Sequence, residues 1–401
     1  MEKLLFVTHD ANRTGAPLFL LNFLQWLRNE RPELRLDVLI RRGGSLDSDF
    51  LRVADDVFRW ESDSALVRLL LATRLMGKRS AAFHRLCRRL SGFEKRLLRT
   101  VRGKEYDLVF VNSLANAGLI PGLADHVDCP IVCRAPELAS YVGDHIGTDP
   151  VAVAIPCVDR FIAVSDLVAS YMVDELGIPA AKIAKIPGFF RPQVPTRPRA
   201  LVRAELGIPD RAFVVCGSGT RDWRKGIDLF LHVAIDLVRR FPHKPVYFCW
   251  VGGDGDMDSS PRLKFDREQS GCSVNLLFVP ETGSPQDYFA ASDVFALTSR
   301  EDPFPLVALE AASLGLPVIC FDAAVGSKEF VNETTGRLVP YPDICAFSDA
   351  IVCLYEDQAL YRRTSENIKR TSLDFTIDKI GRRLVSFLDT IAEPTTSSLG
   401  Q

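Results

Sequence analysis

Short apolar runs of strand length recur along the chain, separated by longer stretches of helical length. The runs are almost continuously apolar, which is typical of strands buried on both faces of a parallel sheet. The clearest runs are Leu4–Val7, Leu36–Ile40, Tyr106–Asn112, Pro130–Cys133, Arg160–Asp166, Ala212–Cys216, Val246–Val251, Val274–Val279, Val294–Leu297 and Pro317–Phe321. Strands that alternate with helices in this way predict an α/β fold with doubly wound sheets.

The most informative stretch covers residues 293–322 and predicts a strand, a short loop, a helix and a second strand. Pro303 and Pro305 mark the helix start, because proline is tolerated in a first helical turn, where its missing N–H would bond nothing. The helix is expected over 306–314, and Gly315 is expected to end it. This order points a helix N-terminus at the carboxyl edge of the sheet, where phosphate-bearing ligands bind.

Two carboxylates frame that helix, Asp302 just before it and Glu310 within it. On a helix they would lie ~12 Å apart along the axis, too far to share one proton or metal but suitably placed to hold two ends of an elongated ligand. In the alternative, Asp302 is a helix cap and Glu310 is a solvated residue. Apolar residues surround Glu310 in the sequence, so burial is expected, and a buried carboxylate needs a partner.

A glycine-rich loop follows the predicted strand 212–216 and precedes a helix that ends near Arg240. The loop carries Arg221, Arg224 and Lys225, three cations within five residues, and a glycine follows the lysine. Backbone amides and cations before a helix N-terminus suit a phosphate group. The alternative is that Lys225 is a surface lysine at a turn.

The segment SREDPFPLVALEAASLGLPVI, residues 299–319, resembles the donor-site signature of glycosyltransferase family 4, retaining enzymes of the GT-B fold. That signature has two glutamates separated by seven residues; here Asp302 takes the first place and Glu310 the second. Lys225 and the following glycine also match a Lys-Gly pair of the family. The resemblance implies two Rossmann-like domains that face a cleft, with a C-terminal helix that crosses back to the first domain.

The chain length of 401 residues is enough for two such domains, each with its own core. A stretch rich in proline and arginine, without periodicity, predicts the linker between them. The Ser/Thr-rich end of the chain predicts a disordered tail. The expected parts are an acceptor-binding domain over 1–188, a linker over 189–204, a nucleotide-sugar-binding domain over 205–375, a returning helix over 376–392 and a tail over 393–401.

The resemblance also implies roles for individual residues. Asp302 would bind hydroxyls of the donor sugar, Glu310 the ribose, and Lys225 the diphosphate. The family's diphosphate-binding arginine has no counterpart at its usual position, so Arg221 and Arg224 both remain candidates. Asp302 and Lys225 are the expected catalytic residues here. The other expected donor contacts, mostly through backbone groups, are Gly15, Ala16, Thr282, Phe304, Leu306 and Val307.

A third expected catalytic residue is Glu137, in the run Arg134–Leu138. Many family members carry His-Glu-Leu at this place, and their histidine lies near the donor sugar. This chain has Pro136 in the place of the histidine but keeps the glutamate. In the alternative, Glu137 is a carboxylate in a first helical turn that offsets the helix dipole.

Composition and charge are ordinary for a globular protein except over residues 59–104. The formal net charge is −2, so nothing favours a nucleic-acid partner, and the ten cysteines are scattered without metal-site spacing. We expect reduced thiols in a cytoplasmic protein, with no leader sequence and no membrane span. Residues 59–104, however, carry thirteen Lys or Arg and three Asp or Glu. This region predicts basic amphipathic helices, which form either a solvated face or a docking surface for an anionic membrane or for an acidic or lipid-linked acceptor.

The predicted function is transfer of a sugar, with retention of anomeric configuration, from a nucleotide-diphosphate sugar to a glycan or lipid-linked acceptor. No metal and no cofactor beyond that co-substrate is expected, and the protein would lie in the cytoplasm or peripherally on the inner membrane face. The alternatives are a catalytically inactive GT-B nucleotide-binding or scaffold protein and a GT-B nucleotide-sugar epimerase. The first predicts nucleotide binding without product, and the second predicts product without an acceptor.

Overall fold

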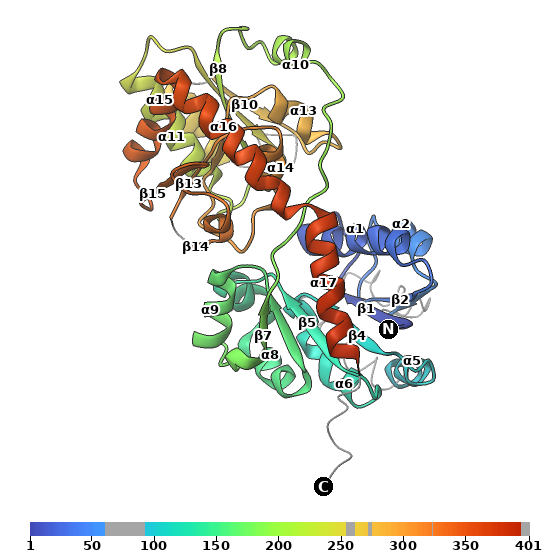
Figure 1. Ribbon diagram of the computed structural model, residues 1–401. Coiled ribbons are helices and arrows are strands. Elements are labelled where there is room, and N and C mark those ends of the chain that lie inside the picture. The colour runs from blue at the N-terminus through green and yellow to red at the C-terminus, as the bar shows by residue number, and fades with distance from the viewer. Residues whose placement is uncertain (61–92, 254–260, 272–274, 323, 394–401) are drawn as a thin grey trace, which may run out of the picture. The chain divides into compact units, whose positions relative to one another are not determined.

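The computed structural model describes residues 1–60, 93–253, 261–271, 275–322 and 324–393. The chain divides into two compact α/β units, each built around one parallel sheet (Figure 1). Unit 1 comprises Met1–Val164, Val168–Ile186 and the chain from Gly381 onward, and unit 2 comprises Ser165–Leu167 and Pro187–Ile380.

Unit 1 contains a seven-stranded sheet in the order β3-β2-β1-β4-β5-β6-β7, with every neighbouring pair parallel. The strands are β1 Lys3–Thr8, β2 Arg35–Ile40, β3 Asp56–Arg59, β4 Leu108–Asn112, β5 Ile131–Ala135, β6 Arg160–Ala163 and β7 Ile183–Lys185. Burial on both faces of the central strands is the reason for their continuous apolar runs. The core is aromatic at its centre, where the Phe6 ring lies 5.6 Å from that of Phe110 and 6.2 Å from that of Phe23.

The helices of unit 1 are α1 Gly15–Glu30, α2 Asp47–Val53, α5 Phe93–Arg102, α6 Ile120–Ala124, α7 Ala139–Tyr141, α8 Thr148–Ala154, α9 from Asp166 to Asp174 and the larger part of α17 Ile377–Ala392. Helix α1 is amphipathic, because Phe19, Phe23 and Leu27 are buried at a spacing of four residues. Gly381 lets α17 lie close to α1, since a Cβ at this position would lie 2.9 Å from the Trp26 ring.

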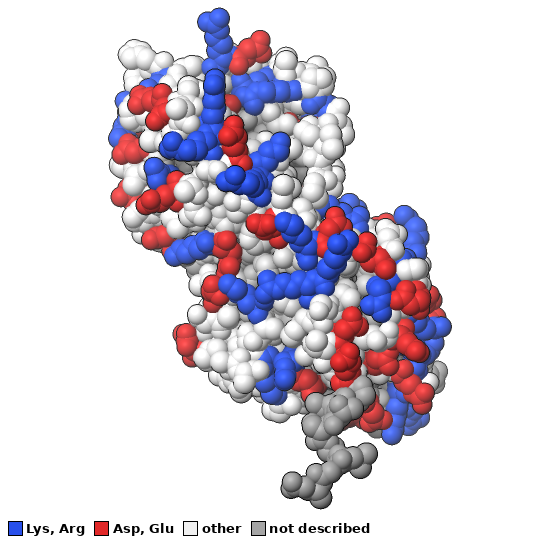
Figure 2. Space-filling model, in the orientation of Figure 1, with Lys and Arg blue, Asp and Glu red and all other residues white. Residues whose placement is uncertain are grey.

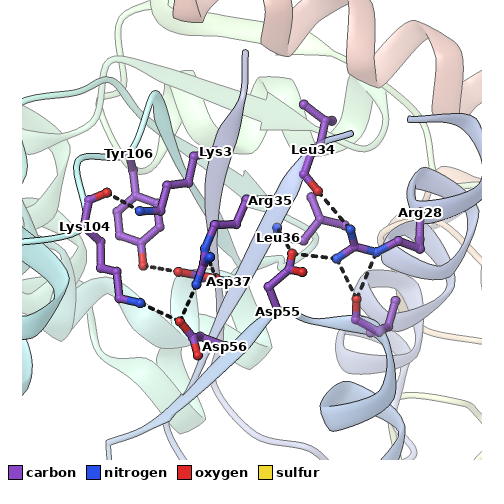
Figure 3. A network of polar contacts seen from close by, with 11 residues as sticks. Lys3, Arg28, Leu34, Arg35, Leu36, Asp37, Asp55, Asp56, Lys104 and Tyr106 are labelled. Atoms are coloured by element: carbon purple, nitrogen blue, oxygen red, sulfur yellow. Dashed lines mark hydrogen bonds and ion pairs between the residues drawn. The ribbon is translucent and has the colours of Figure 1, made fainter. Parts of the chain in front are cut away.

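A network of charged and polar side chains closes the amino edge of the unit 1 sheet (Figure 3). The buried Asp37 carboxylate accepts a hydrogen bond of 2.7 Å from the Tyr106 hydroxyl and lies 3.4 Å from Arg35 Nε. Asp56 pairs with both Arg35, at 2.6 Å, and Lys104, at 2.5 Å. Desolvation, together with Asp37, raises the pKa of Tyr106 far above its usual value. The network thus gives the buried carboxylate both a donor and a counter-charge.

Unit 2 contains a six-stranded parallel sheet in the order β10-β9-β8-β11-β13-β15 and a separate parallel pair, β12 with β14. The strands are β8 Phe213–Ser218, β9 Val246–Val251, β10 Leu276–Val279, β11 Val294–Leu297, β12 Glu301–Asp302, β13 Val318–Phe321, β14 Ala324–Val325 and β15 Gly336–Val339. The Phe230 ring fills the core between Phe248 at 5.6 Å and Trp250 at 5.2 Å.

The helices of unit 2 are α10 Arg199–Glu205, α11 Ile227–Arg240, α12 Pro261–Ser270, α13 Pro285–Ala290, α14 Leu306–Ser313, α15 Ile344–Glu356 and α16 Gln358–Ser372. Helix α10 differs from expectation, because it starts inside the segment 189–204 that the sequence predicts to be an unstructured linker. Arg203 explains the difference: it is only 2% exposed, donates to the carbonyls of Ala212 and Ala291, and pairs with Asp293 at 2.8 Å. These buried contacts attach the segment to unit 2.

Most of the predicted basic region 59–104 lies outside the described residues, at 61–92. On the face shown in Figure 2, Lys and Arg side chains are interspersed with Asp and Glu. Within the described ranges, none of the helices is both long and apolar enough to cross a membrane.

In each sheet the order of strands reverses direction once, at a topological switch point. In unit 1 this switch point lies between β1 and β4, and in unit 2 it lies between β8 and β11, because each pair is adjacent although other strands intervene in the sequence. In doubly wound sheets, ligands bind outside the carboxyl ends of the strands at such a point. The loops that leave β8 and β11 are therefore the first place to look for a site in unit 2.

Candidate functional site

The glycine-rich loop after β8 is held against the loop after β11 in unit 2. Gly226 has a φ of +67° and directly precedes α11, and a Cβ there would collide with the carbonyl oxygen of Thr298. The Thr298 hydroxyl in turn donates to the Gly226 carbonyl at 2.9 Å. Within the loop, the Asp222 carboxylate accepts from the Lys225 amide at 2.9 Å. Only glycine allows this approach, so the position of Lys225 depends on Gly226.

Lys225 and Asp302 form an ion pair at the switch point. The Lys225 ammonium lies 2.6 Å from Asp302 Oδ2, and the two side chains are 14% and 6% exposed. Asp302 is positioned by β12, which pairs with β14 so that Asp302 lies beside Val325. The structure thus brings together the two residues that the resemblance assigns to the diphosphate and the donor sugar.

Glu310 lies on α14, partly buried, as its apolar neighbours in the sequence predict. The expected partner is missing: among the described residues, no side chain hydrogen-bonds its carboxylate. Instead, burial raises the pKa of Glu310 to about 7. A carboxyl group that titrates near neutrality can either accept or donate a hydrogen bond to a ligand hydroxyl.

We expect the free energy of unfolding of Glu310→Gln to rise relative to that of the wild type as pH rises. The pKa of Glu310 is raised from 4.5 to about 7 on folding, so the folded state binds the proton more tightly and loses stability as pH rises from 4.5 to about 7. Glutamine does not titrate and avoids this loss. Because part of the side chain meets solvent, we expect about 1–2 kcal/mol rather than the full shift.

Urea denaturation of both proteins across that pH window measures the difference. Glu268→Gln, at an exposed position of α12, controls for removal of a surface charge. A constant difference between wild type and Glu310→Gln over the whole window would contradict the expectation.

The two arginine candidates are both tied to backbone carbonyls. Arg221 Nε donates to Gly252 at 3.1 Å, and its guanidinium lies 5.3 Å from the Phe278 ring centroid. Arg224 donates to the Glu301 carbonyl at 3.2 Å, next to Asp302. The structure therefore places Arg224 nearer to the ion pair, while Arg221 packs against the ends of β9 and β10.

The start of α14 supplies two backbone donors at the same edge. The Pro305 carbonyl accepts from the amides of Ala308 and Leu309, so the amides of Leu306 and Val307 precede the first intrahelical bond. Phe304, by contrast, turns its ring into a cluster with Phe330 and Phe375, at 6.1 and 5.7 Å. Thr282 lies after β10, and its hydroxyl accepts from the Ser284 amide.

The carboxyl edge of unit 1 carries a second group of predicted residues. Gly15 and Ala16 begin α1, and the Ala16 carbonyl accepts from the Asn112 side chain at the end of β4, at 2.7 Å. Arg134, which sequence reasoning did not assign a role, lies 4% exposed at the end of β5. Its guanidinium lies 3.6 Å from the Phe19 ring centroid and donates to Asn112 at 3.2 Å. The sequence does contain one sign of this role, because a charged arginine near the end of an otherwise apolar strand is unusual.

Glu137 is buried in this same group. Its carboxylate accepts from the Leu114 amide at 3.2 Å and is hydrogen-bonded by Ser113, which has a φ of +94°. Burial raises the pKa of Glu137 to about 7, although both hydrogen bonds and Arg134 oppose the rise. Burial also lowers the pKa of Arg134 to about 10. This titratable, buried environment differs from that of a helix-dipole carboxylate at the surface.

The acidic residues of the site are not gathered as metal ligands. Within the described ranges, no three or more His, Cys, Asp or Glu side chains form a group that could hold a metal ion. Metal independence of the protein stays a prediction.

Comparison with known proteins finds a family match that lies within unit 2. Residues 198–371 match the family model described as Glycosyl transferases group 1. The lipopolysaccharide core biosynthesis mannosyltransferase LpsB of Rhizobium meliloti is 30% identical over 46% of this chain and 54% of its own length. Alpha-galactosylglucosyldiacylglycerol synthase of Streptococcus pneumoniae is 33% identical over 40% of this chain and 41% of its own. The matched part thus spans about half of each curated relative.

Solved structures extend the likeness to both units. The Anabaena protein HepE, crystallised with UDP and glucose, matches with a TM-score of 0.76 at 20% identity, over 97% of this chain and 100% of its own. Likeness at this identity shows the fold, and the fold predicted from the sequence is confirmed. The chain therefore has the GT-B fold, and its residues 198–371 are similar to the group 1 glycosyl transferases.

Proposed function

We propose that the protein is a retaining glycosyltransferase that moves a hexose from a nucleotide-diphosphate sugar to an acceptor hydroxyl. The observation that carries the proposal is the Lys225–Asp302 ion pair at the switch point of unit 2. It places a cation for a diphosphate beside a carboxylate for sugar hydroxyls, where doubly wound sheets bind such ligands. The match of residues 198–371 to the group 1 model supports it.

The chemical task is to stabilise a departing diphosphate and an oxocarbenium-like sugar. Lys225 and the amides of Leu306 and Val307 suit the first part, because preorganised donors act most strongly on charge that develops during the reaction. Asp302 would hold sugar hydroxyls, and Glu310 would hold the ribose. The leaving phosphate would accept the proton of the attacking hydroxyl, so that attack occurs on the face from which the nucleotide departs, and no metal is required.

The acceptor is proposed to be a growing cell-surface glycan or polysaccharide, or a lipid-linked sugar. Two relatives support this class, since their names refer to lipopolysaccharide core biosynthesis and to a glycosyl diacylglycerol. We place the protein in the cytoplasm, either free or peripherally on the inner membrane face. The alternatives from sequence, an inactive binding protein and an epimerase, are distinguished by whether product forms and whether an acceptor is needed.

Calorimetric titration with UDP, GDP and ADP tests the donor site. We expect one nucleotide to bind the wild type with micromolar affinity, and Lys225→Ala and Glu310→Ala each to weaken it at least about tenfold, which is ~1.4 kcal/mol. Lys244→Ala is the matched control, because Lys244 forms an ion pair of 2.7 Å with Glu356 in the same unit. If none of the three nucleotides binds the wild type, the proposal fails.

A further inference from the structure

Trp223 is a large aromatic side chain exposed beside the proposed donor site. It lies in the loop after β8, two residues before Lys225, and is 63% exposed. The other three of the four tryptophans, Trp26, Trp60 and Trp250, are buried. Single exposed apolar residues are ordinary, so exposure alone assigns no role to Trp223.

Arg300 holds the exposed tryptophan in place. Its guanidinium lies 5.2 Å from the Trp223 ring centroid and donates to the Trp223 carbonyl at 2.8 Å. Two further bonds, of 2.8 and 2.6 Å, join it to Asp228 in the first turn of α11. The bidentate pair fixes the guanidinium plane on which the indole rests. Trp223 is therefore exposed and preorganised at the same time.

A second exposed aromatic residue shares the same arginine. Tyr341, 42% exposed, follows β15 and accepts a hydrogen bond of 3.2 Å from Arg300 Nε through its hydroxyl. Its ring stands edge-on to Phe321 at 5.5 Å, and its amide donates to Asp322 at 3.1 Å. We call Trp223, Arg300 and Tyr341 together the aromatic platform.

The chemistry around the aromatic platform selects among ligands. The side chains of Asp222 and Asp322 are both exposed at its borders, and carboxylates accept hydrogen bonds from hydroxyls. Aromatic faces are electron-rich and pack against the polarised C–H face of a sugar ring. Arg300, the one cation among the three residues of the platform, is already paired with Asp228, so the platform itself offers no unpaired positive charge to an anionic ligand.

We propose that the aromatic platform is a binding subsite for a neutral oligosaccharide. This inference rests on the proposed transferase function. It assigns the subsite to the acceptor chain, because the platform adjoins Lys225 on the same loop, and so adds a contact in unit 2 to the acceptor-binding domain expected over 1–188. An aromatic face for C–H groups next to carboxylates for hydroxyls matches a neutral sugar better than a peptide or a lipid. Fixing both aromatic residues through one arginine lowers the entropy lost on binding.

Trp223 is the only exposed tryptophan of the four, so a ligand that covers it should change the tryptophan emission of the protein. An array of neutral and uronic-acid oligosaccharides identifies bound sugars, and tryptophan emission of the full chain is then titrated with them. We expect saturable emission changes with at least one neutral oligosaccharide. Trp223→Ala should weaken that binding at least about tenfold on the array, Trp223→Phe should retain most of it, and Tyr341→Ala should lie between.

Phe265→Ala is the matched control, because Phe265 is 61% exposed on α12 of the same unit. It should bind the same sugars as the wild type. No bound neutral sugar, unchanged binding by Trp223→Ala, or preferential binding of uronic-acid chains would each overturn the subsite. Nucleotide titration separates the two proposals. If Trp223→Ala retains nucleotide binding but loses sugar binding, both proposals are supported. If the wild type binds the sugar but no nucleotide, the subsite is supported and the transferase function is contradicted.

Discussion

Replacing Lys225 with alanine is expected to lower kcat/KM for the nucleotide-sugar donor about 100- to 1,000-fold, the usual effect of removing one preorganised donor from a developing anion. The ammonium lies 2.6 Å from Asp302 Oδ2 at the switch point, so it is fixed before any ligand arrives. Steady-state kinetics at varied donor concentration measures the loss. Lys244→Ala, which breaks a lysine ion pair elsewhere in unit 2, should change kcat/KM less than about threefold.

Removal of Lys225 also leaves the Asp302 carboxylate buried without its counter-charge, which by itself destabilises a protein. The double variant Lys225→Ala with Asp302→Asn separates the two effects. It should recover the melting temperature that Lys225→Ala loses but recover no activity. If the double variant regained turnover, Lys225 would act only by holding Asp302, and its proposed contact with the diphosphate would be wrong.

Gly226→Ala is expected to destabilise unit 2 severely and to abolish nucleotide binding. The backbone at this position has a φ of +67°, and an added Cβ would collide with the Thr298 carbonyl. The strain of a left-handed conformation alone costs about 1–2 kcal/mol. The collision adds to this, because the carbonyl belongs to the neighbouring loop and only backbone movement relieves it.

Gly207→Ala isolates the first contribution. Gly207 has the same φ of +67° in unit 2, and no atom lies within 4 Å of the place that an added Cβ would take. Thermal melting of both variants should therefore show a modest drop for Gly207→Ala and a drop at least twice as large for Gly226→Ala. Equal drops would mean that the two loops separate easily, and that Gly226 does not position Lys225.

Local patterns were enough to predict the regular parts of the fold. The helix expected over 306–314 is α14, which begins at Leu306 and ends at Ser313, followed by Gly315 with a φ of +88°. Proline at its start and glycine at its end act through backbone geometry alone, so no distant residue is needed to locate it. The same holds for the buried apolar runs that became β1, β8 and β11.

Contacts between distant segments could not be predicted in this way. Lys225 and Asp302 are 77 residues apart, and only the crossing of the chain between β8 and β11 brings them together. The resemblance assigned Lys225 to the diphosphate and Asp302 to the sugar of one donor, but it did not predict an ion pair between the two side chains. Helix α10 was missed because Arg203, polar in sequence, is buried by partners 88 and 90 positions away, the Ala291 carbonyl and the Asp293 carboxylate. Family 4 membership and the role of Asp302 in place of glutamate stay predictions.

Both edges of the unit 1 sheet bury polar atoms that lack a hydrogen-bond partner. At the amino edge, Asp37 Oδ1 has no hydrogen bond, although Arg35 Nε lies 3.4 Å from it and Tyr106 donates to the other carboxylate oxygen. At the carboxyl edge, Arg134 Nε and Asn116 Oδ1 are buried without a hydrogen-bond partner. Each such atom costs about 1–3 kcal/mol, so both edges lose stability, but only the carboxyl edge lies where doubly wound sheets bind ligands. Thermostabilising substitutions should therefore be sought at the amino edge, since repacking the carboxyl edge would trade activity for a higher melting temperature.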